Sequence, residues 1–123
     1  MSDFKVTSTV TERRVEDLLC CGMESGHYSD FRIIGYEPAD IQNKCTYPHI
    51  EVPFKEGGVI LMKDKYGDSH KIYRLDRAAL QRGLHVLAEK SPRQMCEFMN
   101  ENEDVITGTE FIQCALLGDI IYG

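Results

Sequence analysis

Apolar residues near the start of the chain recur at helical spacing. Within residues 9–23, they lie on one face of a 3.6-residue period, and charged residues lie on the other. Thr9 and Thr11 compete as the N-cap of this helix, and Gly22 is a residue type at which helices commonly end. The apolar positions of the predicted helix are Val15, Leu18 and Leu19.

Three further segments have the β-branched and aromatic content of strands. They cover residues 31–36, 58–63 and 70–75, and the turn at 64–69 joins the last two as a hairpin. Charged side chains alternate with the apolar ones, as in an antiparallel sheet with one face in water. The residues expected to point from the sheet into the core are Ile33, Ile60, Met62, Ile72 and Leu75.

Two segments show neither helical nor strand periodicity. Residues 22–30 are rich in turn formers, and residues 37–57 contain three prolines. We expect both to be loops. A loop as long as 37–57 is often a functional or mobile part of a compact domain.

Three short helices are predicted after the sheet, and each has a recognisable start. Asp76 can cap a helix that extends to about residue 90, and Ser91 precedes a proline that suits the first turn of the next helix. Thr107 opens a Thr-Gly-Thr-Glu capping box for the last helix, which Gly118 ends. The positions expected to face inward include Leu80, Leu84, Leu87, Ala88, Met95, Phe98 and Met99.

These elements predict one α+β domain over residues 1–123. It consists of an N-terminal helix, a small antiparallel sheet of about three strands, and a C-terminal block of three short helices. Residues 120–122, Ile-Ile-Tyr, are too apolar for a free tail. We expect them to dock on the core or to add to a sheet, with the sheet of a neighbouring copy in a homo-oligomer as an open alternative.

Charge is distributed unevenly along the chain. The net charge is −6, which argues against a general nucleic-acid binder because such proteins need a basic footprint. Residues 1–56 carry 10 acidic and 6 basic groups, residues 57–90 carry 4 and 7, and residues 91–123 carry 6 and 1. A basic central region therefore lies between two acidic ones.

The acidic residues near the C-terminus are the first candidate for a binding surface. They surround one helix–loop–helix junction that contains no lysine or arginine, and such a patch can direct a protein onto a basic partner surface. The predicted partner-binding residues are Glu97, Glu101, Glu103, Asp104 and Glu110.

The central hairpin is the alternative candidate, for a nucleotide or another anionic small molecule. Basic and aromatic side chains alternate in it, as they do where proteins contact phosphates and bases. The predicted ligand-binding residues of this alternative are Arg32, His49, Lys71, Arg74, Tyr66 and Tyr73.

No strong catalytic motif is present, and we expect a non-enzymatic protein without a cofactor or metal. His49 and Glu51 would share one face of an extended segment and form an acid–base pair, but no nucleophile accompanies them. The five cysteines form no C-x-x-C pair, so reduced thiols are expected, with Cys20, Cys21 and His27 as a weak alternative metal set.

The start of the chain does not resemble a signal peptide, and no apolar run could span a membrane, so a cytoplasmic location is expected.

Several motifs resemble a family of short proteins encoded by phages and prophages. The residues that carry this resemblance are Val15-x-x-Leu18-Leu19, Tyr47-Pro48-His49, Gly57-Gly58, Ala79 to Leu84, Ala88-Glu89-Lys90-x-Pro92-Arg93, and the segment from Thr107-Gly108 to Tyr122-Gly123. The resemblance implies no catalytic residue. It implies a context, because small acidic phage proteins without catalytic motifs are often inhibitors of host defence, including anti-CRISPR proteins.

The function expected from the sequence is therefore that of a phage-encoded binding protein. It would inhibit a bacterial defence complex in the host cytoplasm by placing its acidic surface on a basic protein or ribonucleoprotein. The alternative function is sequestration of a nucleotide or other small signalling ligand.

Overall fold

The computed structural model describes residues 8–26, 29–68 and 70–123, and it has the predicted α+β architecture. A three-stranded antiparallel sheet follows the N-terminal helix and precedes a block of helices. The longer elements are α1 (Glu12–Met23), β1 (Phe31–Glu37), β2 (Val59–Asp64), β3 (Tyr73–Leu75), α3 (Arg77–Lys90), α4 (Pro92–Met99) and α5 (Val105–Leu117). The shorter helical turns are η2 (Ile41–Lys44), α2 (Pro48–Glu51) and η3 (Val52–Phe54).

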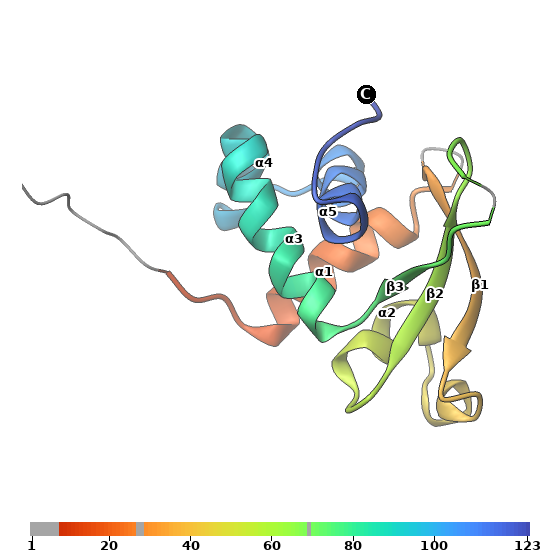
Figure 1. Ribbon diagram of the computed structural model, residues 1–123. Coiled ribbons are helices and arrows are strands. Elements are labelled where there is room, and N and C mark those ends of the chain that lie inside the picture. Colours follow the sequence, from red (N-terminus) through yellow and green to blue (C-terminus); the bar gives the residue numbers. More distant parts are fainter. Residues whose placement is uncertain (1–7, 27–28, 69) are drawn as a thin grey trace, which may run out of the picture.

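α5 is the central helix of the molecule. It packs against both α1 and α3, and the sheet lies to one side of these helices (Figure 1). Every residue from Phe111 to Leu116 is buried. A helix covered on nearly all sides is apolar around its whole circumference, which describes this segment apart from Gln113.

The contact between α1 and α5 depends on two glycines. α1 ends at Met23, the last residue of the predicted helix, but Gly22 is buried inside it and is not the residue that ends it. A Cβ atom on Gly22 would lie 2.5 Å from the backbone oxygen of Gly108 in α5, and a Cβ on Gly108 would overlap the backbone nitrogen of Gly22. The two backbones therefore touch, which only glycine permits.

The helix starts agree in part with the predictions. Thr11 caps α1 by accepting a hydrogen bond from the backbone N–H of Arg14, so the alternative cap at Thr9 is wrong. Asp76 caps α3 as predicted. Ser91 immediately precedes α4 as predicted, but its side chain makes no capping hydrogen bond.

α5 begins three residues earlier than predicted. Its N-cap is Asp104, whose carboxylate accepts from the backbone N–H of Thr107, while the Thr107 hydroxyl accepts from the backbone N–H of Asp104. Thr107 is thus the third helical residue rather than the cap. Its hydroxyl also donates to the side chain of Gln94 in α4 at 2.6 Å, a tertiary contact that fixes this register.

The sheet has the order β1-β2-β3, and a β-bulge interrupts the pairing of β1. Ile33 pairs with Met62, but Gly35 rather than Ile34 is next in register, opposite Leu61. The extra residue shifts by one the alternation of side chains between the two faces of the sheet, so that Tyr36 points towards the core.

Most of the predicted inward-facing strand residues do face the core. Ile60, Met62 and Leu75 are buried and Ile33 is partly buried against them, whereas Ile72 is 51% exposed. The prediction for Ile72 is wrong because β3 begins only at Tyr73, so Ile72 lies in the connection before the strand.

The segment 37–57 is not the long loop that its composition indicates. Pro48 occupies the first turn of α2, and Pro53 occupies the first turn of η3. The N–H group that proline lacks has no hydrogen-bond partner at these positions, so proline is tolerated there. Apolar side chains along this segment reach the interior, where Ile41, Ile50, Val52 and Pro53 are buried. Isolated turns of this kind have too few residues to show a helical period in the sequence.

The C-terminal segment docks on the core, as predicted. The buried Gln113 accepts hydrogen bonds from the backbone N–H groups of Ile121 and Tyr122, both at 2.8 Å, and donates to Tyr122 and Asp30. The Tyr122 hydroxyl donates to Asp64 at 2.6 Å. Polar bonds to Gln113 and Asp64 hold this segment, while the side chain of Ile121 remains exposed.

The Gly108→Ala substitution tests the backbone contact between α1 and α5. We expect it to lower the free energy of unfolding by about 3 kcal/mol, because the helices would have to move apart. Gly35→Ala is the matched control, since its Cβ would meet only Leu61, at 3.8 Å. Urea unfolding measures both, and equal effects of the two substitutions would contradict the prediction.

A second prediction concerns Asp30, whose pKa is raised by burial and by the nearby Asp64 carboxylate. A raised pKa in the folded state gives a stabilisation that is present at low pH and lost as the pH rises through that pKa. Asp30→Asn should therefore gain stability over the unaltered protein as the pH rises from about 3 to 7. Urea unfolding at several pH values measures this, with the exposed Asp40→Asn as control. An identical pH dependence of Asp30→Asn and the unaltered protein would contradict it.

Candidate functional site

The predicted acidic surface contains a cation that the fold supplies from elsewhere in the chain. The guanidinium of Arg14 in α1 binds the Glu103 carboxylate directly and lies 3.4 Å from Asp17 and 3.7 Å from Glu101. It also donates to the backbone oxygen of Phe98 at 2.7 Å and lies over the Phe98 ring, 4.9 Å from its centroid. We call these three carboxylates and Arg14 the Arg14 cluster.

The Arg14 cluster remains acidic in sum, because one guanidinium faces three carboxylates. The side chain of Glu103 is only 8% exposed, that of Arg14 is 20% exposed, and that of Glu101 is 75% exposed. The hydrogen bond to Glu103 raises the pKa of Arg14, so the guanidinium stays charged. Glu103 is thus part of the interior, and Glu101 presents the exposed charge.

The other predicted partner-binding residues have mixed positions. Asp104 is exposed, but its carboxylate is engaged in capping α5. Glu97 and Glu110 are half-buried, and burial raises the pKa of Glu110. The structure does not bring the five residues together as one exposed patch.

Glu101 has a backbone conformation that is unusual for its residue type. Its φ of 59° is the only positive value among the described non-glycine residues. The chain turns there because the backbone N–H of Asn102 donates to Glu97 and that of Glu101 donates to Phe98, a helix end at which glycine is common. The left-handed conformation costs about 1 kcal/mol and places the Glu101 carboxylate beside Arg14.

The alternative, ligand-binding set is divided between the two faces of the sheet. Arg32 and Arg74 lie on the outer face, away from the helices, where Arg74 pairs with Glu37 at 2.8 Å. Tyr73 points to the inner face, and the ammonium of Lys71 lies 4.8 Å from the centre of its ring.

Tyr66 and His49 lie apart from both arginines. Tyr66 is exposed in the turn and packs edge-on against Tyr122, with ring centroids 5.3 Å apart. His49 lies on α2, and its Nε2 is 3.0 Å from the carboxylate of Glu24 at the end of α1. The arginines of the outer face therefore have no aromatic partner from the predicted set.

The expected acid–base pair of His49 and Glu51 does not form. The prediction of extended backbone is wrong, because both residues lie in the short helix α2, where the Glu51 carboxylate accepts from the backbone N–H of Tyr47. The Sγ of Cys20 lies 3.3 Å from the carboxylate of Glu24, which His49 also contacts. Burial raises the pKa of the Cys20 thiol to about 11. This thiol is protonated at neutral pH and is a poor nucleophile.

All five cysteines are free thiols, of which Cys114 is buried and Cys96 is exposed. Among the described residues, no group of three or more histidine, cysteine or acidic side chains could hold a metal ion. His27, the third member of the weak metal set, lies outside the described residues.

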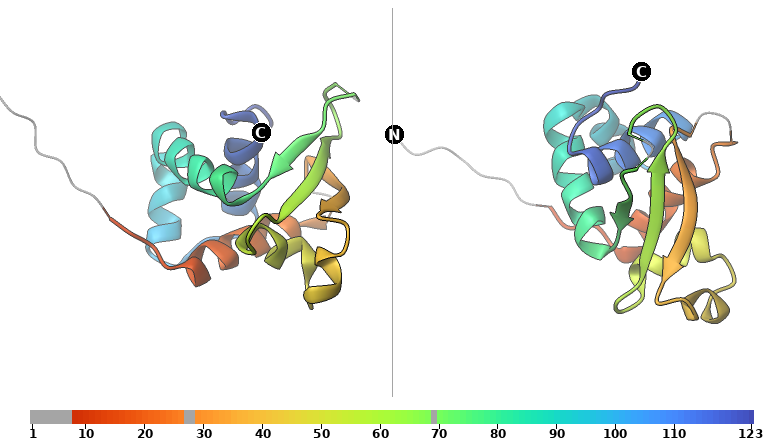
Figure 2. Two further views of the ribbon diagram at one scale, coloured as in Figure 1. Left: turned by 60° about the horizontal axis from the view of Figure 1, so that its bottom comes forward. Right: turned by 45° about the vertical axis from the view of Figure 1, so that its right-hand side comes forward.

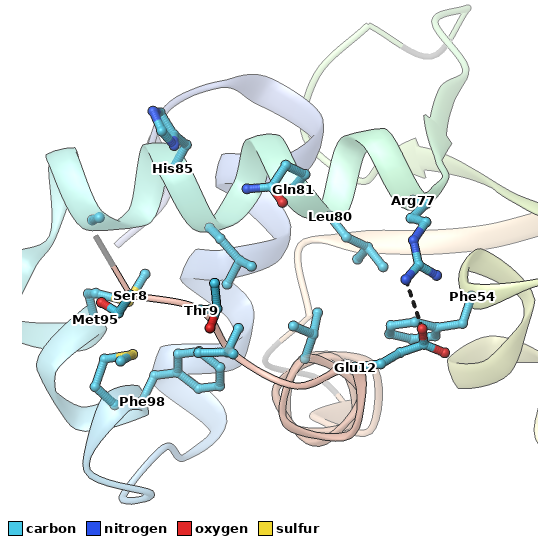
Figure 3. A pocket seen from close by; sticks show the side chains of 15 residues that line it. Ser8, Thr9, Glu12, Phe54, Arg77, Leu80, Gln81, His85, Met95 and Phe98 are labelled. Atoms are coloured by element: carbon cyan, nitrogen blue, oxygen red, sulfur yellow. Dashed lines mark hydrogen bonds and ion pairs between the residues drawn. The ribbon is translucent and has the colours of Figure 1, made fainter. Parts of the chain in front are cut away.

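A groove of about 440 Å³ lies between α1, α3 and α4 (Figure 3). Its floor is formed by the buried side chains of Val15, Leu80 and Phe98. Met95 and Phe98 lie at one end, and the ion pair of Arg77 with Glu12, at 2.8 Å, lies at the other. The remaining residues that line the groove are Ser8, Thr9, Val10, Phe54, Gln81, Leu84, His85, Ala88 and Met99.

Sequence reasoning missed this groove, although it noticed the residues that form it. Ala88 and Met99 were expected inside the core, but Ala88 is exposed and Met99 is 44% exposed. The apolar stripes of α3 and α4 are thus wider than the contact between these helices needs. This surplus of apolar positions is the signal in the sequence that indicates a groove, but the sequence does not show which of these positions stay uncovered.

A scan against protein-family models, a search of curated proteins and a search of solved structures each return no match for this chain. No helix in the described part of the chain is both long enough and apolar enough to cross a membrane. The fold class, α+β, therefore follows from the arrangement of the chain itself.

The Arg14→Met substitution tests the Arg14 cluster. It leaves the nearly buried Glu103 carboxylate unpaired, and we expect a loss of about 3 kcal/mol in the free energy of unfolding. Adding Glu103→Gln should restore part of this loss, because the unpaired charge is then removed. Arg13→Met, at a neighbouring side chain that is 85% exposed, is the control and should change stability by less than about 0.5 kcal/mol. A double variant no more stable than Arg14→Met would contradict the assignment.

Proposed function

We propose that this chain is a non-enzymatic binding protein, and that its groove together with the adjoining Arg14 cluster receives a segment of a partner protein. The observation that carries the proposal is an open groove whose lining combines apolar side chains with polar ones such as Gln81 and His85, and which is bordered by excess negative charge. Concave sites of a few hundred Å³ that combine apolar walls with a few polar groups are the usual form of a binding site.

The walls of the groove suit a protein segment. Met95 and Met99 provide flexible, polarizable side chains that adapt to different apolar partners. Leu84 and Ala88 form the facing wall on α3, and the exposed alanine leaves room for a side chain of the partner. An apolar side chain inserted here would gain burial without displacing a residue of the core.

Charge favours a segment with basic residues beside its apolar anchor. The groove and the Arg14 cluster share Phe98, whose ring forms part of the groove floor while its backbone oxygen binds Arg14. Glu101 follows Met99 by two residues and carries the most exposed carboxylate of the cluster. Lysine or arginine flanking the anchor would meet this negative charge, which speeds association and favours basic partners over acidic ones.

The resemblance to phage-encoded proteins supports a partner in a bacterial defence complex, which this chain would inhibit by occupying one of its surfaces. That part of the proposal rests on the resemblance alone. Affinity purification from a bacterial host that carries defence systems, followed by an interference assay with the purified complex, tests it.

Binding of designed peptides tests the groove itself. We expect a peptide with leucine or methionine anchors and flanking lysines to bind more tightly than the same peptide with flanking glutamates. Ala88→Glu should weaken binding of the lysine peptide at least tenfold, about 1.4 kcal/mol, because it places a charge in the groove. Ala78→Glu on the same helix is the control, because Ala78 is also exposed but does not line the groove. Fluorescence anisotropy measures all of these affinities.

A third variant separates charge from folding. Glu101→Gly removes the exposed carboxylate and also relieves its left-handed backbone, so it should stabilise the fold while weakening binding of the lysine peptide, most strongly at low salt. The proposal fails if neither peptide binds at about 1 mM, or if Ala88→Glu binds as tightly as Ala78→Glu.

A further inference from the structure

The outer face of the sheet holds two unneutralised cations side by side. Arg32 on β1 is paired directly with Lys63 on β2. Like charges at directly paired positions destabilise a sheet, because their Cβ atoms are only about 5 Å apart. Among the described residues, no acidic group lies within ion-pair distance of either side chain.

Next to this pair the sheet forms a shallow apolar floor. The β-bulge places Gly35, which has no side chain, opposite Leu61, one step along the same face. Apart from the residues directly before and after it in the chain, a Cβ on Gly35 would meet the Leu61 side chain, at 3.8 Å. The half-buried Leu61 is therefore accessible from the outer side.

A charged pair lies beyond the floor. Arg74 on β3, opposite Leu61, reaches across β2 to the carboxylate of Glu37 on β1. Both side chains are about half exposed. Arg74 retains further N–H donors, and Glu37 offers a carboxylate oxygen that can accept from a ligand.

Within the described part of the chain, the long helices lie on the other side of the sheet from this face, while the turns η2 and η3 contact β1 and β2 (Figure 1). In the right-hand view of Figure 2 the strands β1 and β2 lie in front, with α3 and α5 to their left. None of the residues named here lines the groove between α1, α3 and α4. The two surfaces are therefore separate, and this inference goes beyond the proposed function.

We propose that the outer face of the sheet binds a phosphorylated small molecule of the nucleotide class. The phosphate lies between the Arg32 guanidinium and the Lys63 ammonium and removes their repulsion, and arginine is well suited to bidentate contact with phosphate. The flat base or sugar lies over Leu61 and Gly35. An N–H or O–H of the ligand donates to Glu37.

The charge balance favours a small ligand over a nucleic acid. A polyanion needs basic contacts along its length, and the chain as a whole carries a charge of −6. The face offers three basic residues, of which Arg74 is already paired with Glu37. One phosphate group satisfies the two that remain.

Isothermal titration of the full chain with a panel of probes tests the inference. The panel contains nucleoside monophosphates, cyclic nucleotides, the corresponding nucleosides, inorganic phosphate and a short single-stranded oligonucleotide. We expect at least one phosphorylated nucleoside to bind, its unphosphorylated nucleoside to bind at least tenfold more weakly, and inorganic phosphate to bind weakly.

Variants assign the binding to this face. Arg32→Gln and Lys63→Gln should each weaken nucleotide binding at least tenfold, while Lys90→Gln, an exposed lysine at the end of α3, should leave it unchanged. Gly35→Leu should weaken nucleotide binding but retain the weak binding of phosphate. Melting temperatures without ligand verify folding, and those of Arg32→Gln and Lys63→Gln should not fall because each variant relieves repulsion.

Three results would overturn the inference. The first is that no nucleotide in the panel binds at millimolar concentration. The second is that Arg32→Gln and Lys63→Gln bind as tightly as Lys90→Gln. The third is tighter binding of the oligonucleotide than of any mononucleotide, which would make the face a nucleic-acid contact instead.

Discussion

The backbones of α1 and α5 touch at Gly22 and Gly108, and much of the remaining structure depends on this contact. It draws α5 close enough to α1 for the whole turn from Phe111 to Leu116 to be buried, with α3 closing the other side through a second close approach at Gly83. Because this part of α5 sits so deep, Gln113, the one polar residue between Phe111 and Leu116 apart from a cysteine, must find partners inside the protein. It finds them in the C-terminal segment, which is thereby fixed against the end of the sheet.

The same helix crossing creates the surfaces to which we assign binding. It places Arg14 of α1 beside the loop between α4 and α5, so that the acidic residues of that loop are partly neutralised and partly buried. Phe98 lies beneath Arg14 and also forms part of the groove floor. An apolar groove and an acidic edge therefore adjoin, and a partner can engage both at once. The outer face of the sheet, on separate elements, carries the opposite charge.

Several local sequence signals, in which a side chain acts on its own backbone, were correct, although Ser91 makes no capping hydrogen bond. Asp76 and Thr11 cap helices with hydrogen bonds to residues three positions on, and Gly118 ends α5 in a left-handed conformation. The α+β class and the order of helix and strand segments followed from the same short-range patterns. The start of α5 did not, because Asp104 and Thr107 are competing caps in the sequence, and the structure uses Asp104 while the Thr107 hydroxyl donates to Gln94 of α4. The helical turns within 37–57 were missed because each has only three or four residues, too few to show a repeating pattern of apolar positions.

The candidate sites divide in the same way. By itself the sequence determined that acidic residues gather near the C-terminus and basic ones in the centre, because the position of each charged residue along the chain is read directly from the sequence. Only the tertiary structure decided which of these charges face solvent. It placed Arg14 among the carboxylates, set Arg32 against Lys63 across a strand pair, and left Ala88 and Met99 uncovered. The physical reason is that neutralisation and burial depend on distances in space, and residues such as Arg14 and Glu103 become neighbours only when the chain folds.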